Sequence, residues 1–266
     1  MSDNILQVQT LAQYVAANNK LPEVLFWVGC AGSYDDRYKK VTIAFAKILQ
    51  HLEIDFAVLG PEESCTGDPA RRAGNEFLFQ MQAAANIEVL NTYNVKKIVT
   101  ACPHCFNTIK NEYPELGGDY EVIHHATYLQ TLIDQGKIKL EGGGVFKGKK
   151  ITYHDSCYLG RANNIYEAPR QVLEVLDADL VEMKRCKTTG LCCGAGGAQI
   201  FKESEKGTSE IHHERAGEAI ETGANIVAAA CPFCMLMLRD GMKHHNKEEE
   251  LKIYDLAELV ALDKGL

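Results

Sequence analysis

Short apolar runs alternate along the chain with longer segments whose apolar residues recur every three or four positions. Apolar runs of roughly four to eight residues are typical of buried strands, and the three- and four-residue spacing indicates amphipathic helices. Strands are predicted within 24–30, 97–101, 122–125, 151–157, 226–230 and 252–255. Helices are predicted at 5–17, 41–52, 75–93, 169–176, 209–222 and 256–262.

Strand and helix patterns therefore alternate, and their order occurs twice. This alternation predicts an α/β fold of two pseudo-symmetric units, each with a mainly parallel sheet. Residues 1–20 are expected to form an N-terminal helix, 21–145 the first unit and 146–266 the second. The glycines at 142–144 and the basic segment 147–150 form the expected hinge between the two units.

The cysteines follow the same repeat. The first half contains Cys30, Cys65, Cys102 and Cys105, and the second contains Cys157, Cys186, Cys192, Cys193, Cys231 and Cys234. Cys30 and Cys65 are 35 positions apart, as are Cys157 and Cys192, and both halves then end in Cys-x-x-Cys. Because binding sites of parallel sheets form at the carboxyl ends of the strands, each unit is expected to gather its cysteines at that edge.

Both Cys-x-x-Cys motifs come directly after a strand and open a helix. A helix N-terminus favours thiolate over thiol, and the proline after the first cysteine fits the first helical turn. Thiolates bind metals. A thioredoxin-like dithiol is the rival interpretation of one such motif. Because the motif occurs twice, each time with matching upstream cysteines, the thioredoxin-like interpretation is weaker than metal binding.

Composition narrows the class of protein further. The net charge is -8 at pH 7, and no stretch gathers basic residues into a patch that would follow phosphates. No apolar run approaches the roughly 20 residues of a membrane-spanning helix, and residues 1–10 lack the features of a signal peptide. We therefore expect a cytoplasmic protein that binds no nucleic acid and whose cysteines are reduced.

The repeated pattern of the second half offers five cysteines, Cys157, Cys192, Cys193, Cys231 and Cys234, where a cubane cluster or a structural zinc needs four. The adjacent pair Cys192–Cys193 is followed by glycines at 194, 196 and 197, which let the backbone wrap closely around a bulky group. One member of the pair as a buried spectator thiol is the plain alternative. Cys186 has no counterpart in the first half and is expected not to be a ligand.

In these motifs the chain resembles the cysteine-rich, or CCG, domain family, which includes a component of heterodisulfide reductase and the iron–sulfur proteins of glycolate and lactate oxidation systems. The resemblance rests on the set of a cysteine, Cys-Cys-Gly and Cys-x-x-Cys, which is complete in the second half and has Cys-Thr-Gly in the first. It also rests on His-Asp-Ser-Cys-Tyr-Leu-Gly-Arg at 154–161 and on Asp-Pro-Ala-Arg-Arg at 68–72. It implies a noncubane four-iron cluster made of two smaller units bridged partly by cysteine sulfur. By resemblance its ligands are Cys157, Cys192, Cys193, Cys231 and Cys234.

The first half departs from this pattern, because the spacing places Thr66 where the second cysteine of the pair belongs. Ser64 is the other candidate for the replacement. Four ligands remain, and they satisfy either a [4Fe-4S] cluster or Zn²⁺. Those ligands are Cys30, Cys65, Cys102 and Cys105. We favour the cluster, because electron transfer would use it.

The expected function is that of an iron–sulfur electron-transfer subunit of an oxidoreductase complex. No ferredoxin run of cysteines and no dinucleotide-binding glycine motif occurs, so electrons enter and leave through partners. By resemblance these are a ferredoxin-type iron–sulfur subunit, a flavoprotein, or both, and any contact with a membrane is peripheral. The alternative is a zinc-stabilised scaffold without redox activity. The substrate, with thiol/disulfide, quinone and 2-hydroxy-acid pathways as candidates, is left open.

Several other side chains have two interpretations. His154 either donates a hydrogen bond to a cluster sulfur or is structural. Arg161 either neutralises a cluster or forms a surface ion pair. The histidine pairs at 124–125, 212–213 and 244–245 are expected to be solvated or capping residues.

Overall fold

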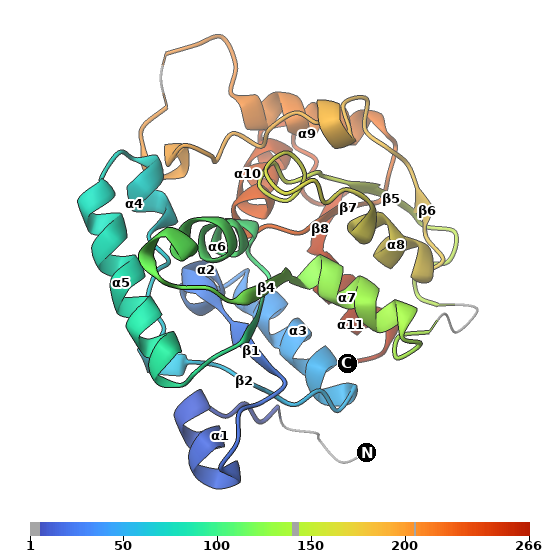
Figure 1. Ribbon diagram of the computed structural model, residues 1–266. Helices are drawn as coiled ribbons and strands as arrows, with labels where there is room; N and C mark the ends of the chain where they lie inside the picture. The colour runs from blue at the N-terminus through green and yellow to red at the C-terminus, as the bar shows by residue number, and fades with distance from the viewer. Residues whose placement is uncertain (1–5, 140–143, 205) are drawn as a thin grey trace.

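The computed structural model describes residues 6–139, 144–204 and 206–266. Figure 1 shows two α/β units joined through a layer of helices. The first unit contains α1 (Leu11–Asn18), β1 (Val24–Trp27), α2 (Gly29–Tyr34), α3 (Lys39–His51), β2 (Phe56–Ala57), α4 (Asp68–Arg72), α5 (Glu76–Thr92), β3 (Lys97–Thr100), α6 (Pro103–Asn107), β4 (Glu121–His124) and α7 (His125–Asp134). The second contains β5 (Lys150–Tyr153), α8 (Glu167–Val175), β6 (Asp179–Leu180), α9 (Ile211–Glu221), β7 (Ile226–Ala229), α10 (Pro232–His244), β8 (Lys252–Asp255) and α11 (Leu256–Asp263).

Each unit is built on a four-stranded parallel sheet. The strand orders are β2-β1-β3-β4 and β6-β5-β7-β8, so the two sheets have the same topology. Strands β1 and β7 are buried along their whole length, as expected for parallel strands covered on both faces. The predicted fold class, two pseudo-symmetric α/β units, is confirmed.

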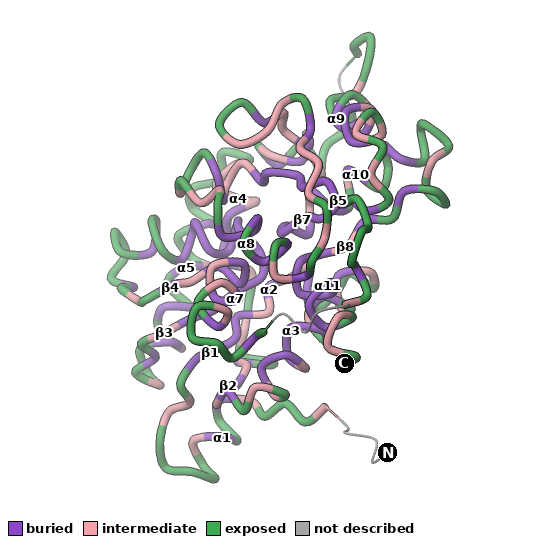
Figure 2. The backbone as a smooth tube through the Cα atoms, turned by 90° about the vertical axis from the view of Figure 1, so that its right-hand side faces the viewer, coloured by how far each residue is buried: buried purple, intermediate pink, exposed green. Residues whose placement is uncertain are grey.

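The two units pack against each other through helices. Helix α3 of the first unit lies against α11 of the second, and α7 lies against α8. Since α3 and α8 are equivalent in the repeat, as are α7 and α11, these two contacts are related by the internal pseudo-symmetry. Figure 2 shows buried residues running through the strands and these helices, whereas α1 is largely exposed.

The N-terminal helix is shorter than the sequence pattern predicts. It begins at Leu11, because Thr10 forms a capping box with Gln13: the Thr10 hydroxyl accepts from the Gln13 N–H at 3.3 Å, and the Gln13 side chain accepts from the Thr10 N–H at 3.0 Å. Residues 9–10 instead pair with Val58 beside β2, which makes the preceding segment extended. The predicted start at residue 5 is therefore wrong for 6–10, and residue 5 itself lies outside the described residues.

The expected hinge is only partly visible, because residues 142 and 143 lie outside the described residues. Gly144 lies against α11, where a Cβ atom would be 2.3 Å from the Asp263 carboxylate. None of the helices in the described ranges combines the length and apolar character needed to cross a bilayer.

Candidate metal centres

The cysteines lie at the carboxyl ends of the strands, as the sequence predicts. Cys30 follows β1 in the first turn of α2, and Cys157 follows β5. Cys102 and Cys231 are the N-cap residues of α6 and α10, each followed by a proline at the first helical position. This arrangement turns the thiols of each Cys-x-x-Cys motif toward the positive end of a helix.

The structure brings the four cysteines of the first half into one pocket. Its lining includes Cys30, Cys65, Cys102, Cys105, Thr66, Asp68 and Phe233. The hydrogen bond from the Cys30 thiol lowers the pKa of Cys65 to about 6, and the same bond raises the pKa of Cys30. A hydrogen bond to Cys102 raises the pKa of Cys105. The four sulfur atoms therefore face one another, and the hydrogen bond favours the thiolate form of Cys65 over that of Cys30.

Thr66 rather than Ser64 faces this pocket. Thr66 lines it and is only 2% exposed, and it occupies the position in the repeat that Cys193 has in the second half. The Ser64 hydroxyl instead donates to the Asn86 side chain at 2.9 Å. The first pocket thus has a hydroxyl where the second has a thiol.

Five of the six cysteines of the second half, all but Cys186, form one connected cluster of sulfur atoms. Hydrogen bonds from Cys157 and Cys193 hold the pKa of Cys192 far below its usual value. Cys234 contacts both Cys193 and Cys231. Apolar side chains surround this cluster: Ala195, Ile200, Phe233 and Met237.

The surroundings of the second cluster fit an iron–sulfur group. Five soft sulfur donors exceed what a tetrahedral zinc takes. The buried Ser156 hydroxyl and His154 Nε2 have no hydrogen-bond partner within the described ranges. Buried polar groups are normally paired, so these atoms indicate that a hydrogen-bonding group belongs in this site.

The two candidate centres lie next to each other across the boundary between the units. His104, inside the first Cys-x-x-Cys motif, hydrogen-bonds to Cys231 of the second set. Phe233 holds the equivalent position in the second motif and lines the first pocket. The ring centroids of His104 and Phe233 are 4.9 Å apart, and those of His104 and Tyr158 are 4.3 Å apart. Aromatic rings therefore fill the space between the two sets of cysteines.

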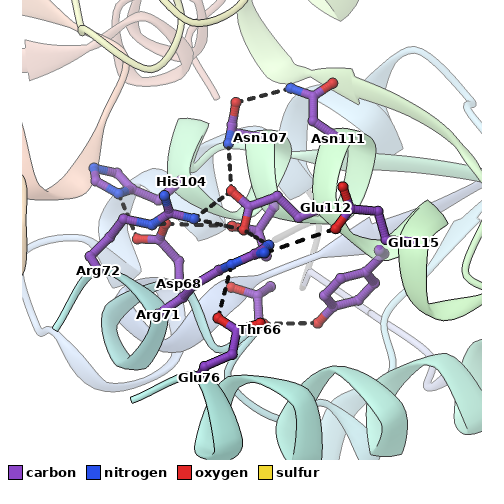
Figure 3. Close-up of polar contacts among 12 residues, drawn as sticks. Thr66, Asp68, Arg71, Arg72, Glu76, His104, Asn107, Asn111, Glu112 and Glu115 are labelled. Atoms are coloured by element: carbon purple, nitrogen blue, oxygen red, sulfur yellow. Dashed lines mark hydrogen bonds and ion pairs between the residues drawn. The ribbon is translucent and has the colours of Figure 1, made fainter. Parts of the chain in front are cut away.

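Charged groups around α4 hold His104 in place, as Figure 3 shows. The Asp68 carboxylate lies 2.9 Å from His104 Nδ1. Burial lowers the pKa of His104, but Asp68 and Cys231 outweigh it, so the pKa lies well above the usual value. Arg72 forms an ion pair with Asp68, at 3.2 Å, and a second ion pair with Glu112. The segment 68–72 singled out in the sequence is thus a support for the first pocket.

Two other candidates from the sequence, Cys186 and Arg161, have different surroundings from the nine proposed ligands. Cys186 is the N-cap residue of a short 3₁₀ turn. Burial, and after it the negative charge of Glu182, raises the pKa of Cys186. Arg161 donates to the Gly190 carbonyl rather than to an exposed carboxylate. Arg161 nevertheless lines a small pocket together with Cys157 and Cys192.

The expectation for the histidine pairs was only partly correct. His124 caps α7, as expected, by accepting from the Ala126 N–H at 3.3 Å. His125, however, is fully buried, and its Nε2 lies 2.8 Å from the Asp255 carboxylate of the other unit. His212 is also buried and lies 2.9 Å from Asp240. The role of His104 was not predicted, because it depends on a contact between the two units.

Comparison with known proteins places this arrangement in a family. The cysteine-rich domain model, CCG, matches residues 24–110 and 151–239, once in each unit. The chain is 45% identical over 240 residues to a Bacillus subtilis protein named "Probable iron-sulfur-binding oxidoreductase FadF", covering 90% of this chain and 34% of that protein. It is 40% identical over 259 residues to the "EtfAB:quinone oxidoreductase" of Syntrophomonas wolfei, covering 95% of this chain and 36% of that one.

A third relative is a subunit of the dihydromethanophenazine:CoB–CoM heterodisulfide reductase of Methanosarcina barkeri, with 36% identity over 92% of this chain and 59% of that relative. The chain thus spans about a third of the length of the first two relatives. A hypothetical protein from Helicobacter pylori shares the fold alone, with a TM-score of 0.50 and 10% identity over 93% of this chain and 50% of that one. Two matches to one domain model cover most of the chain, so the protein belongs to the CCG cysteine-rich domain family.

Proposed function

We propose that this protein is an iron–sulfur electron-transfer component of an oxidoreductase complex. Its second unit would hold a noncubane [4Fe-4S] cluster through Cys157, Cys192, Cys193, Cys231 and Cys234. The observation that carries the proposal is the convergence of five sulfur atoms, including both members of the adjacent pair, on one site. Relatives named as iron–sulfur oxidoreductases support the same class of function.

The first unit would hold a four-cysteine centre through Cys30, Cys65, Cys102 and Cys105. Without a fifth thiol, this set suits a [4Fe-4S] cluster or Zn²⁺. We favour the cluster, because the first pocket lies beside the second set and a metal there would be well placed to exchange electrons with it. His104, which belongs to one motif and contacts the other, is the closest described link between the two.

Electrons would be exchanged with a ferredoxin-type iron–sulfur subunit, a flavoprotein, or both. Relatives carry the names of a quinone oxidoreductase and a reductase subunit, which favours work within an assembly. We further propose the division into an N-terminal helix over 1–20 and cysteine-rich units over 21–145 and 146–266. All ten cysteines are free, which suits a reducing compartment such as the cytoplasm.

The test is chemical analysis of protein purified without oxygen. Iron, acid-labile sulfide and zinc are measured per chain, together with visible absorption and electron paramagnetic resonance (EPR) spectra. We expect at least about four irons per chain, because one four-iron cluster is the minimum that the proposal requires. Cys193→Ala should lose or convert the second cluster, because one of its five proposed ligands is removed.

Cys186→Ala is the matched control, since it removes a thiol from the same unit outside the set. It should leave iron content and spectra unchanged. Zinc without iron in anaerobically prepared protein would contradict the proposal and favour the zinc-stabilised scaffold. If the Cys193→Ala variant kept its iron content and spectra unchanged, Cys193 would not be a ligand and the second site would have only four.

A further inference from the structure

His154 lies just after β5, beside the cysteines of the second candidate centre. Its side chain is only 1% exposed. One of its ring nitrogens lies within 4.8 Å of both Cys193 Sγ and Cys234 Sγ. The ring is therefore buried and in reach of the sulfur atoms.

The hydrogen bond to Arg215 decides which ring nitrogen carries the proton. Arg215 Nε donates to His154 Nδ1 at 3.0 Å, and a guanidinium is a donor only. Nδ1 must therefore accept, and the proton of the neutral ring lies on Nε2. Arg215 is itself fully buried and fixed by the Arg185 carbonyl and the Glu218 carboxylate, both at 2.7 Å.

Nε2–H is thus a donor without a partner among the residues that the structure describes. A buried donor of this kind destabilises the folded protein unless a bound group pairs with it. The described side chains that approach this ring besides Arg215 include Cys193 and Cys234. An acceptor in the site would satisfy the donor.

We propose that His154 donates a hydrogen bond from Nε2 to a sulfur atom of the group held by the second set of cysteines. His154 is then a positioning residue that sets the electronic properties of that group, and it is not a ligand. This inference rests on the proposed function. Coordination by Nε2 would require the proton on Nδ1, where it would face the Arg215 N–H.

The first unit carries a related feature at the equivalent position. Trp27, at the end of β1, occupies the place in the repeat that His154 occupies after β5. It is fully buried, and its indole N–H also lacks a partner among the described residues. Both units therefore place a neutral ring N–H donor at the end of the first core strand.

A hydrogen bond to a cluster sulfur stabilises the reduced state, because it offsets the added negative charge. His154→Leu, which keeps the bulk and removes the donor, should shift the reduction potential of the second cluster to a more negative value. His154→Gln, which restores a neutral N–H, should return the potential toward that of the wild type. The potential is measured by redox titration followed by EPR, at iron and sulfide contents matched to the wild type.

A second measurement detects the histidine beside the cluster directly in the wild-type protein. In protein labelled with ¹⁵N-histidine, pulsed EPR of the paramagnetic cluster should show weak histidine couplings. The coupling of His154 should be lost in His154→Leu, while that of His104, which contacts Cys231, should remain. His213→Leu, on the surface side of α9, is the control and should change neither the coupling nor the potential. Arg215→Met should weaken the coupling, because it frees the ring to change tautomer.

An assembled cluster with an unchanged potential in His154→Leu and no lost coupling would overturn the inference. Loss of cluster iron in that variant, together with a strong ligand-type coupling in the wild type, would make His154 a ligand and also overturn it. Absence of iron from the wild-type protein is a different result, which contradicts the proposed function itself.

Discussion

Asp155 shows how a single buried charge can hold a strand end that carries a metal-binding cysteine. It lies two residues before Cys157 and accepts hydrogen bonds from both terminal nitrogens of Arg170, at 2.9 and 3.0 Å. It also accepts from the Lys187 N–H at 2.7 Å. Arg170 and Asp155 are both nearly inaccessible to solvent, so Asp155 depends on Arg170 for compensation of its charge, while Arg170 also pairs with Glu182 at 2.6 Å.

Arg170→Met should lower the free energy of unfolding by about 3–5 kcal/mol, because it leaves the Asp155 carboxylate buried without its main partner. Anaerobic urea denaturation followed by far-ultraviolet circular dichroism measures this change. Lys39→Ala is the control: it removes an exposed ion pair with Asp36 and should cost less than about 1 kcal/mol. Equal effects of the two substitutions would contradict the argument.

At the scale of the elements, the strands that carry cysteines were predictable and the edges of the sheets were not. Strands β1, β3, β5 and β7 are short apolar runs before a cysteine, and both signals lie within a few residues. Strands β2 and β6 have two residues each, too few for any periodicity. The start of α1 was mispredicted because the pairing of residues 9–10 with Val58 is a tertiary contact.

The packing of α9 on α10 also depends on a feature that no local pattern reveals. A Cβ atom on Gly241 would lie 2.5 Å from the His212 carbonyl oxygen and 2.6 Å from the Ala216 Cβ. The two helices can approach this closely only because residue 241 has no side chain. Gly217 on α9 is different, since its added Cβ would meet only the His245 ring, at 3.7 Å.

These two glycines give a matched prediction. Gly241→Ala should destabilise the protein by about 1–3 kcal/mol, because it overpacks the helix contact. Gly217→Ala should stabilise it by up to about 1 kcal/mol, because alanine has the higher helix propensity and space is available. Thermal unfolding of the two variants side by side measures the difference, and a stabilising Gly241→Ala would show that the helices separate easily.

On the scale of the whole molecule, the candidate centres depend on how the two units fit together. The sequence predicted nine ligands from the repeated spacing and the family resemblance, and the structure gathers them into two sets. It could not predict that His104 of one unit touches Cys231 of the other, because that contact requires both units to be folded and docked. The same boundary contains the Arg37–Glu258 ion pair at 2.6 Å and the buried His125–Asp255 hydrogen bond at 2.8 Å.

We therefore expect the two units to unfold together. Trp27 is the sole tryptophan and reports on the first unit, whereas circular dichroism reports on both. The two signals should change at the same urea concentration. His125→Leu should lower the free energy of unfolding by about 1–3 kcal/mol and so move both transitions to lower urea concentration, because Asp255 loses a buried partner. His51→Leu, at an exposed position of α3, should have little effect. Separate transitions in the wild type would mean that each unit folds alone, and a contact such as that of His104 with Cys231 could then open and close without unfolding either unit.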